Sequence, residues 1–83
     1  MRYQVVLKPR ATKDVNALAH GEREKVLEKT CALADNLHGD VKRLTNFTPS
    51  YRLRVGNYRV LFEIEGTQVV VYRIKHRREA YRQ

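Results

Sequence analysis

Apolar and polar residues alternate most regularly between residues 51 and 64, in the segment YRLRVGNYRVLFEI. The alternation continues on both sides of Gly56-Asn57, which predicts two antiparallel strands joined by a two-residue loop. In that register three pairs lie opposite one another: Val55 with Tyr58, Arg54 with Arg59, and Leu53 with Val60. Residues that oppose each other point to the same face of a sheet. One face is therefore expected to be apolar, and the other is expected to gather three arginines: Arg52, Arg54 and Arg59.

The N-terminal half of the chain predicts one strand followed by two helices. Residues 2–8, RYQVVLK, are typical of a short strand, and the proline that follows suits the first turn of a helix over residues 9–20. Gly21 is expected to break the chain. The clearest helix covers residues 22–36, with one apolar ridge and a flanking row: Val26, Thr30, Leu33 and Leu37, then Leu27, Cys31 and Ala34. Cys31 is accordingly expected to be buried.

The second half predicts a connecting loop, the hairpin and a last strand. Residues 37–50 are rich in turn formers, and Leu44 is expected to plug the core while the two cations before it stay outside. Residues 68–75, QVVVYRIK, are typical of a strand, and three successive valines indicate burial on both faces and hence a central position. The register of this strand stays open, because a slip of one residue would move Arg73 between faces.

The predicted order of elements is βααβββ with a basic tail. This order predicts an α+β fold of two layers, in which a helical hairpin packs on one face of a mainly antiparallel sheet. The first strand is expected to lie beside a later strand, in either direction. The length favours one domain, which we expect to span residues 1–83.

Positive charge concentrates in the part of the chain that is predicted to form the sheet. The formal net charge is +8, and residues 51–83 carry eight Lys or Arg against three Asp or Glu, whereas residues 1–50 carry nine against six. This balance favours a nucleic acid, an acidic protein or an anionic surface as the partner. The single cysteine excludes an intrachain disulfide, and no apolar run has the length of a membrane span. We therefore expect a cytoplasmic protein without a membrane partner.

The three clustered arginines are the main candidates for chemistry. Like charges placed opposite each other destabilise a sheet, so their presence on one small patch favours a site for an anion such as phosphate. The simpler alternative is a solvated face of the sheet. The sequence has no cluster of Cys and His typical of a metal site and no glycine-rich loop typical of a nucleotide site. We expect neither a metal nor a cofactor.

Two segments, YRLRVGNYRVLFEI and VVVYRIKHRREAYR, resemble the RelE family of bacterial toxins within the wider RelE/ParE superfamily. Residues 9–11 and 42–44 fit the same pattern, so the resemblance covers essentially the whole chain. It implies a small α+β protein that enters the ribosomal A site and cuts messenger RNA there. In this family the ribose 2′-hydroxyl attacks the adjacent phosphate without a metal, and an acidic RelB-like antitoxin silences the toxin. The implied partners are therefore messenger RNA, the ribosome and an antitoxin.

Carried over residue by residue, the resemblance implies a catalytic set on the hairpin and the tail: Arg52, Arg54, Arg59, Arg77 and Tyr81. Arg78 is the alternative position for the tail arginine. The remaining cations are candidates for contacts with RNA and the ribosome: Lys42, Arg43, Arg73, Lys75, Arg78 and Arg82. The best-known members carry lysines where this chain has Arg52 and Arg54. A lysine there has been assigned a role in proton transfer, which arginine cannot easily take over.

The implied reaction needs a group that accepts the 2′-hydroxyl proton and a group that protonates the leaving oxygen. The candidates are Tyr81, His76 and Lys75, or groups of the ribosome and RNA, and we include His76 in the catalytic set. Alternatively, Tyr81 packs the tail and His76 only orients it. Two other functions stay open: a ParE-like inhibitor of DNA gyrase and a non-enzymatic RNA-binding module. The tail HRREAY together with Arg59 favours the nuclease, because a gyrase inhibitor needs no such catalytic set.

Overall fold

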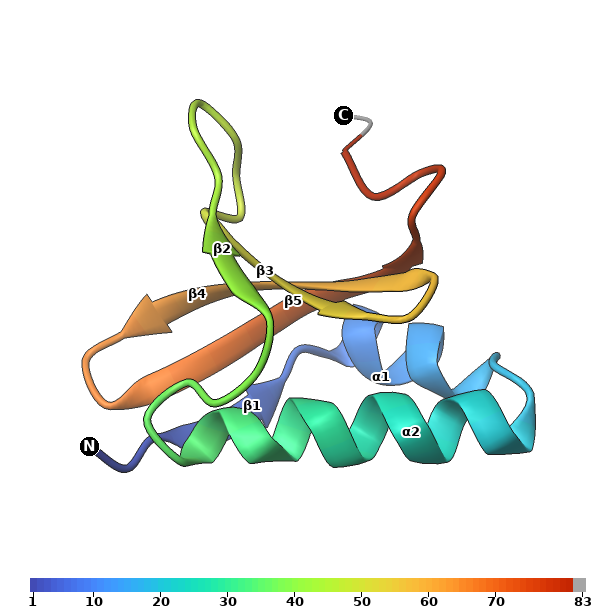
Figure 1. Ribbon diagram of the computed structural model, residues 1–83, viewed down its shortest axis with the longest axis horizontal. Helices are drawn as coiled ribbons and strands as arrows, with labels where there is room; N and C mark the ends of the chain where they lie inside the picture. The colour runs from blue at the N-terminus through green and yellow to red at the C-terminus, as the bar shows by residue number, and fades with distance from the viewer. Residues whose placement is uncertain (82–83) are drawn as a thin grey trace.

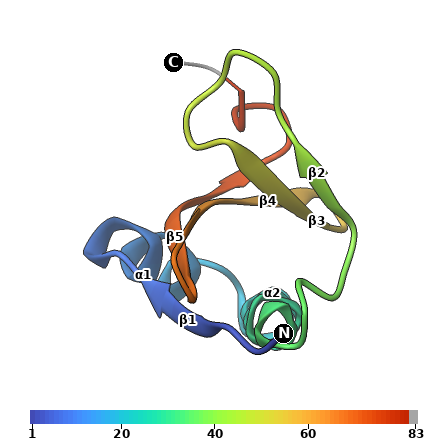
Figure 2. The same ribbon diagram turned by 90° about the vertical axis from the view of Figure 1, so that its left-hand side faces the viewer.

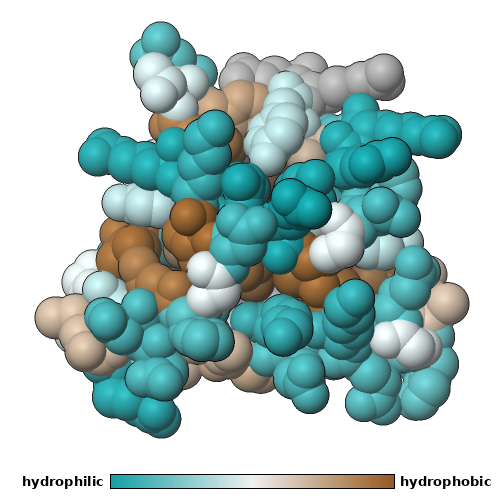
Figure 3. Space-filling view, in the orientation of Figure 1, coloured by the Kyte–Doolittle hydropathy of each residue, from teal (hydrophilic) through white to brown (hydrophobic). Residues whose placement is uncertain are grey.

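Five strands form one twisted sheet, and two helices cover one of its faces (Figures 1 and 2). The computed structural model describes residues 1–81. The elements follow in this order: β1 (Gln4–Leu7), α1 (Pro9–Asn16), α2 (His20–Cys31), the 3₁₀ turn η1 (Ala32–Ala34), β2 (Val41–Arg43), β3 (Tyr51–Val55), β4 (Tyr58–Glu65) and β5 (Gln68–His76). The predicted two-layer α+β fold is confirmed, with one strand more than the sequence indicated. On the face shown in Figure 3, an apolar band separates the hydrophilic upper and lower parts of the molecule.

The sheet has the strand order β1-β5-β4-β3-β2, with β1 parallel to β5 and every other pair antiparallel. The β3–β4 hairpin has the predicted register, with Arg54 opposite Arg59 and Leu53 opposite Val60. Gly56 begins its loop with a φ of +56°, which glycine adopts without the steric cost of a Cβ atom. The central position of the last strand is also confirmed, because β5 lies between β1 and β4 and its three valines are buried.

The structure also gives the β4–β5 register that the sequence left open. Gly66 and Thr67 alone form the loop between these strands. Further along, Tyr72 is an extra residue without a partner in β4, so that Arg73 lies opposite Leu61. Leu61 is buried but does not belong to the main core, whereas the guanidinium of Arg73 beside the bulge reaches Asp14 of α1.

The helices pack against the sheet through two buried ridges. Ala11 and Val15 of α1 are four residues apart, and Val26 and Thr30 of α2 repeat this spacing. Leu33 of η1 extends the second ridge, as predicted. These residues meet the apolar face of β3, β4 and β5 in one core cluster. Within residues 1–81, neither helix is long and apolar enough to cross a membrane.

Three predictions about the helices are wrong. α1 ends at Asn16, and Gly21 lies in the first turn of α2 instead of breaking the chain. The chain turns earlier, and Ala19 adopts the extended conformation that precedes α2. Gly21 costs little in this place, because it is exposed and first-turn amides have no partner within a helix. Cys31, predicted to be buried, is exposed, although Leu27 in the same flanking row packs against the core.

Residues 37–50 do not form the simple loop that the sequence predicted. β2 lies within them and pairs with β3, with Val41 opposite Leu53. Its three residues are too few for alternation to identify a strand from sequence. Leu44 is only half-buried and stays outside the core cluster, because β2 ends at the residue before it and the chain then leaves the sheet.

Candidate functional site

Five cationic side chains lie on the face of the sheet opposite the helices. Pairing places Lys42 of β2 opposite Arg52 of β3. It also places Arg54 of β3 opposite Arg59 of β4, which in turn lies opposite Lys75 of β5. Opposed residues share a face, so the predicted gathering of three arginines is confirmed and extended by two lysines. We call this surface, made by these five residues, the cationic face.

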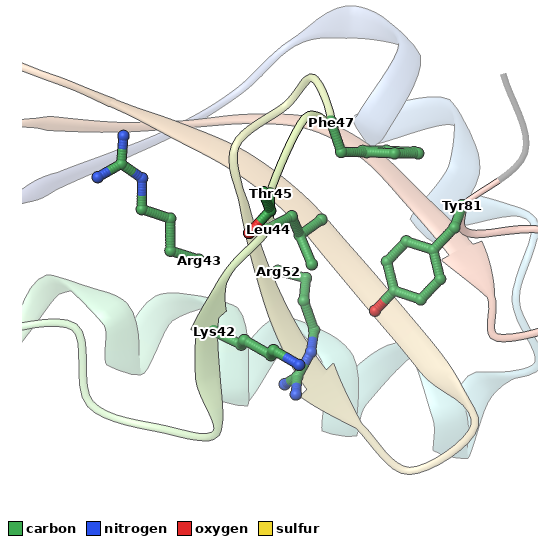
Figure 4. A pocket seen from close by; sticks show the side chains of 7 residues that line it. All are labelled: Lys42, Arg43, Leu44, Thr45, Phe47, Arg52 and Tyr81. Carbon is green, nitrogen blue, oxygen red and sulfur yellow. The ribbon is translucent and has the colours of Figure 1, made fainter.

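Two segments stand above the cationic face and border a hollow of about 420 Å³ (Figures 1 and 4). One is the β2–β3 connection, residues 44–50, and the other is the tail, residues 77–81. The lining residues come from both segments and from the sheet: Lys42, Arg43, Leu44, Thr45, Phe47, Arg52 and Tyr81. In Figure 4 the hydroxyl of Tyr81 points toward the ends of Lys42 and Arg52. The hollow therefore brings a phenol together with two cations.

Hydrogen bonds fix the β2–β3 connection at its base. The backbone N–H and the hydroxyl of Ser50 both donate to Oε2 of Glu63 in β4, at 3.0 and 3.2 Å. The N–H of Leu44 donates to the carbonyl oxygen of Ser50 at 2.6 Å. The rings of Phe47 and Tyr81 meet edge to face with their centroids 5.7 Å apart, which joins this connection to the tail.

The tail is held as a turn rather than left free. The N–H of Arg77 donates to the carbonyl oxygen of Asn57 at 2.7 Å, and the N–H of Glu79 donates to that of His76 at 2.9 Å. Ala80 is only 1% exposed, although it belongs to the tail. These contacts hold the following residue, Tyr81, at the hollow with 44% of its surface exposed.

Asp40 positions the arginine in the floor of the hollow. Nη1 of Arg52 donates to the carbonyl oxygen of Asp40 at 2.7 Å and lies 3.3 Å from Oδ1, while Nη1 of Arg54 lies 3.9 Å from Oδ2. Gly39 lets the chain approach β3 this closely, because its φ is +135° and a Cβ atom there would lie 2.7 Å from Cδ1 of Leu53. Sequence analysis missed Asp40, since only a prediction of β2 would have placed it beside β3.

The other predicted catalytic arginines lie beside the hollow and do not line it. Nη1 of Arg59 donates to the carbonyl oxygens of Gly56 and Tyr58, both at 3.0 Å, which holds this guanidinium at the end of the hairpin. The side chain of Arg54 is 60% exposed. Arg77 is exposed where the tail begins. These cations extend the positive surface away from the hollow.

His76 faces the helices and not the hollow. It lies opposite Tyr58 in the sheet, and the two rings meet edge to face at 5.6 Å. The Tyr58 hydroxyl donates to Glu22 of α2 at 3.1 Å, and burial together with this carboxylate raises the pKa of Tyr58. Nδ1 of His76 accepts the N–H of Arg78 at 3.3 Å. The structure thus favours the alternative in which His76 orients the tail.

Arg73 is held by an acidic residue of α1. Its Nε and Nη2 donate to Oδ2 and Oδ1 of Asp14 at 2.7 and 3.2 Å, and the N–H of Ile74 donates to Oδ2 at 3.0 Å. Burial alone would raise the pKa of Asp14, but the hydrogen bonds from Arg73 and Ile74 outweigh it and keep this pKa below its ordinary value. Arg73 therefore anchors β5 to α1, and its contact with RNA stays a prediction.

The remaining candidates for RNA contact lie in different places. Arg43 lies opposite Tyr51 and belongs to the lining of the hollow, but in Figure 4 its guanidinium extends away from Tyr81. Arg78 is exposed on the tail. Arg82 lies outside the described residues. Within residues 1–81, no three His, Cys, Asp or Glu side chains form a group that could hold a metal ion.

Comparisons with known proteins identify the family. The model of the ParE toxin of the type II toxin–antitoxin system parDE matches residues 5–81. Toxin RelE3 of Methanocaldococcus jannaschii is 32% identical over 63 residues, and the match covers 72% of this chain and 72% of that protein.

Solved structures agree with these matches. A chain of the toxin–antitoxin complex RelBE2 from Mycobacterium tuberculosis has a TM-score of 0.80 and 26% identity, covering 92% of this chain and 99% of that chain. A chain of the archaeal RelE–RelB complex from Pyrococcus horikoshii has a TM-score of 0.74 and 25% identity, covering 96% and 100%. The family predicted from the hairpin and the tail is thereby confirmed: the chain belongs to the RelE/ParE superfamily of toxins from type II toxin–antitoxin systems.

Proposed function

We propose that this toxin is a ribosome-dependent endoribonuclease that cuts messenger RNA in the A site. The observation that carries the proposal is the hollow on the cationic face, where Tyr81 meets Lys42 and Arg52 beside further cations. A single RNA strand offers regularly spaced phosphates to such a surface, and its unstacked bases can contact aromatic rings. The ribosomal target puts the proposed activity in the cytoplasm.

The proposed reaction is attack of the ribose 2′-oxygen on the adjacent phosphorus, which expels the 5′-oxygen and leaves a 2′,3′-cyclic phosphate. Arg52 stabilises the charge that develops on the nonbridging oxygens, because guanidinium can donate two hydrogen bonds to one phosphate. Arg54, Arg59 and Lys75 bind neighbouring phosphates along the sheet. Since these residues supply the charge stabilisation, the proposed reaction uses no metal and no cofactor.

Tyr81 is the proposed acceptor of the 2′-hydroxyl proton. Its hydroxyl points toward the floor of the hollow, where Lys42 and Arg52 lie. His76 is a weaker candidate, because its ring packs against Tyr58 on the other side of the sheet. Groups of the ribosome or of the RNA are the remaining alternative.

We infer that an acidic, RelB-like antitoxin inhibits this toxin. Two structural relatives were solved in complexes, one in the toxin–antitoxin complex RelBE2 and the other in a RelE–RelB complex. The net charge of +8 also favours an acidic partner. An antitoxin segment that covers the hollow would block access of RNA to Tyr81. A segment that displaces residues 77–81 would instead remove Tyr81 from the site. Inhibition without a change at either place would instead mean that the bulk of the antitoxin keeps the toxin out of the ribosome.

A ParE-like inhibitor of DNA gyrase is the second candidate function, because the family model that matches this chain is that of the ParE toxin of parDE. A basic module that binds RNA without cutting it is the third. The purified chain is added to translating ribosomes and, separately, to gyrase in a supercoiling assay. Cleavage of the message at the A site with unchanged supercoiling supports the proposal. Blocked supercoiling with an intact message favours the gyrase inhibitor, and binding to RNA without either effect favours the third candidate.

A further inference from the structure

The proposed reaction leaves one proton without a donor. When the bond from phosphorus to the 5′-oxygen breaks, this oxygen must be protonated to leave easily. The guanidinium groups of Arg52, Arg54 and Arg59 bind phosphate well but keep their protons throughout the physiological range. The donor must therefore be another group of the toxin, the ribosome or the RNA, and an ammonium group at the hollow meets this requirement.

Among the residues that line the hollow, Lys42 is the one that carries an ammonium group. It comes from β2, the strand that sequence analysis did not predict, and lies directly opposite Arg52. Figure 4 shows its end beside the end of Arg52, with the Tyr81 hydroxyl directed toward both. A phosphate bound by Arg52 would therefore lie between a phenol and an amine.

Lys75 is the other lysine of the cationic face, but its position is different. It lies opposite Arg59 in the sheet, next to the end of the hairpin, and does not line the hollow. Lys75 can bind a neighbouring phosphate from there. The geometry points to Lys42 as the catalytic residue that protonates the leaving 5′-oxygen, an inference that rests on the proposed nuclease function.

The 2′-hydroxyl gives its proton to the phenolate of Tyr81, and the 2′-oxygen forms a bond to phosphorus. The bond from phosphorus to the 5′-oxygen breaks with its electron pair on oxygen, which takes a proton from the ammonium group of Lys42. The products are a 2′,3′-cyclic phosphate and a 5′-hydroxyl, and exchange with water restores both side chains.

The test separates proton donation from positive charge. The cut site is first mapped with the parent chain on translating ribosomes, and a second message then carries sulfur in place of the bridging 5′-oxygen at that site. A thiolate leaves without being protonated, so this message needs no acid. Lys42→Arg keeps the charge but does not readily give up a proton. Lys13→Arg is the matched control, because Lys13 is exposed on α1, on the other side of the sheet.

Lys42→Arg is expected to cut the oxygen message about a hundredfold more slowly than the parent and the sulfur message at close to the parent's rate. The control should cut both messages as the parent does. The inference is overturned if Lys42→Arg matches the parent on both messages, or if it is equally slow on both. It is also overturned if sulfur restores Lys75→Arg instead, which would make Lys75 the donor. A parent chain that leaves both messages intact refutes the nuclease function itself, and the role of Lys42 is then refuted with it.

Discussion

Removing the carboxylate of Asp14 is expected to destabilise the fold where the β1 side of β5 has no strand beside it. β1 pairs with β5 only as far as Val71. Beyond that point, Asp14 of α1 accepts the N–H of Ile74 at 3.0 Å and two hydrogen bonds from Arg73 at 2.7 and 3.2 Å. The substitution Asp14→Ala removes all three hydrogen bonds and leaves the guanidinium and the N–H without this partner.

The exposure of the pair sets the magnitude of the effect. The side chains of Asp14 and Arg73 are 14% and 29% exposed, so water reaches them only in part. A shielded donor that loses its partner costs about 1–3 kcal/mol, and breaking a fully buried pair costs about 3–5 kcal/mol. We expect a loss of about 2 kcal/mol, out of a total stability of roughly 4–12 kcal/mol for a domain of this length. The melting temperature should fall by about 8–16 °C.

The effect of Asp14→Ala should depend on pH. Although burial opposes it, the hydrogen bonds from Arg73 and Ile74 lower the pKa of Asp14 in the folded protein. A carboxyl group with a lowered folded pKa stabilises the fold fully above its ordinary pKa and loses this contribution as the pH falls through the folded pKa. The difference in melting temperature between the parent and Asp14→Ala should therefore be complete near neutral pH and shrink below about pH 4.

Thermal melting followed by circular dichroism measures this difference. Glu28→Ala is the matched control, because Glu28 is an exposed carboxylate on α2. If Asp14→Ala melts within about 2 °C of Glu28→Ala near neutral pH, the contacts of Asp14 contribute no net stability. A difference that persists undiminished at low pH would refute the charge of Asp14 as its cause.

Two further predictions concern the hollow. Asp40→Ala frees the guanidinium of Arg52, so single-turnover cleavage on ribosomes should slow by about tenfold while the chain still folds; an unchanged rate would mean that Asp40 does not position Arg52. Tyr81→Phe keeps the ring against Phe47 but removes the hydroxyl, so cleavage should slow by about a hundredfold with unchanged ribosome affinity. If Tyr81→Phe cleaves normally and Tyr81→Ala does not, Tyr81 stacks on a base and carries no proton.

The β3–β4 hairpin could be predicted from sequence because everything that defines it is local. Alternation identifies both strands, and the two-residue loop Gly56-Asn57 fixes their register. The gathering of Arg52, Arg54 and Arg59 on one face follows from that register alone. The family resemblance rested on this same segment and on the tail, which explains why it was confirmed together with the fold.

The parts that sequence reasoning missed depend on contacts between distant segments. β2 has three residues and is defined by its pairing with β3, so Asp40 and Lys42 could not be placed beside Arg52. Asp14 and Arg73 are 59 residues apart, and nothing in either segment indicates the other. The bulge at Tyr72 sets the pairing of Arg73 with Leu61, and an extra residue in a strand leaves no clear pattern in the sequence.

The chemistry of the RNA ends tests the central claim most directly. Messages are isolated from translating ribosomes after a short exposure to the parent chain or to Arg52→Ala, and both ends of each fragment are analysed. The account predicts that the parent leaves a 2′,3′-cyclic phosphate and a 5′-hydroxyl at the A-site codon, and that Arg52→Ala cuts at least about tenfold more slowly at the same position. Intact messages with the parent chain, or equal cleavage by Arg52→Ala, would contradict the assignment of the cationic face as the RNA-cleaving site.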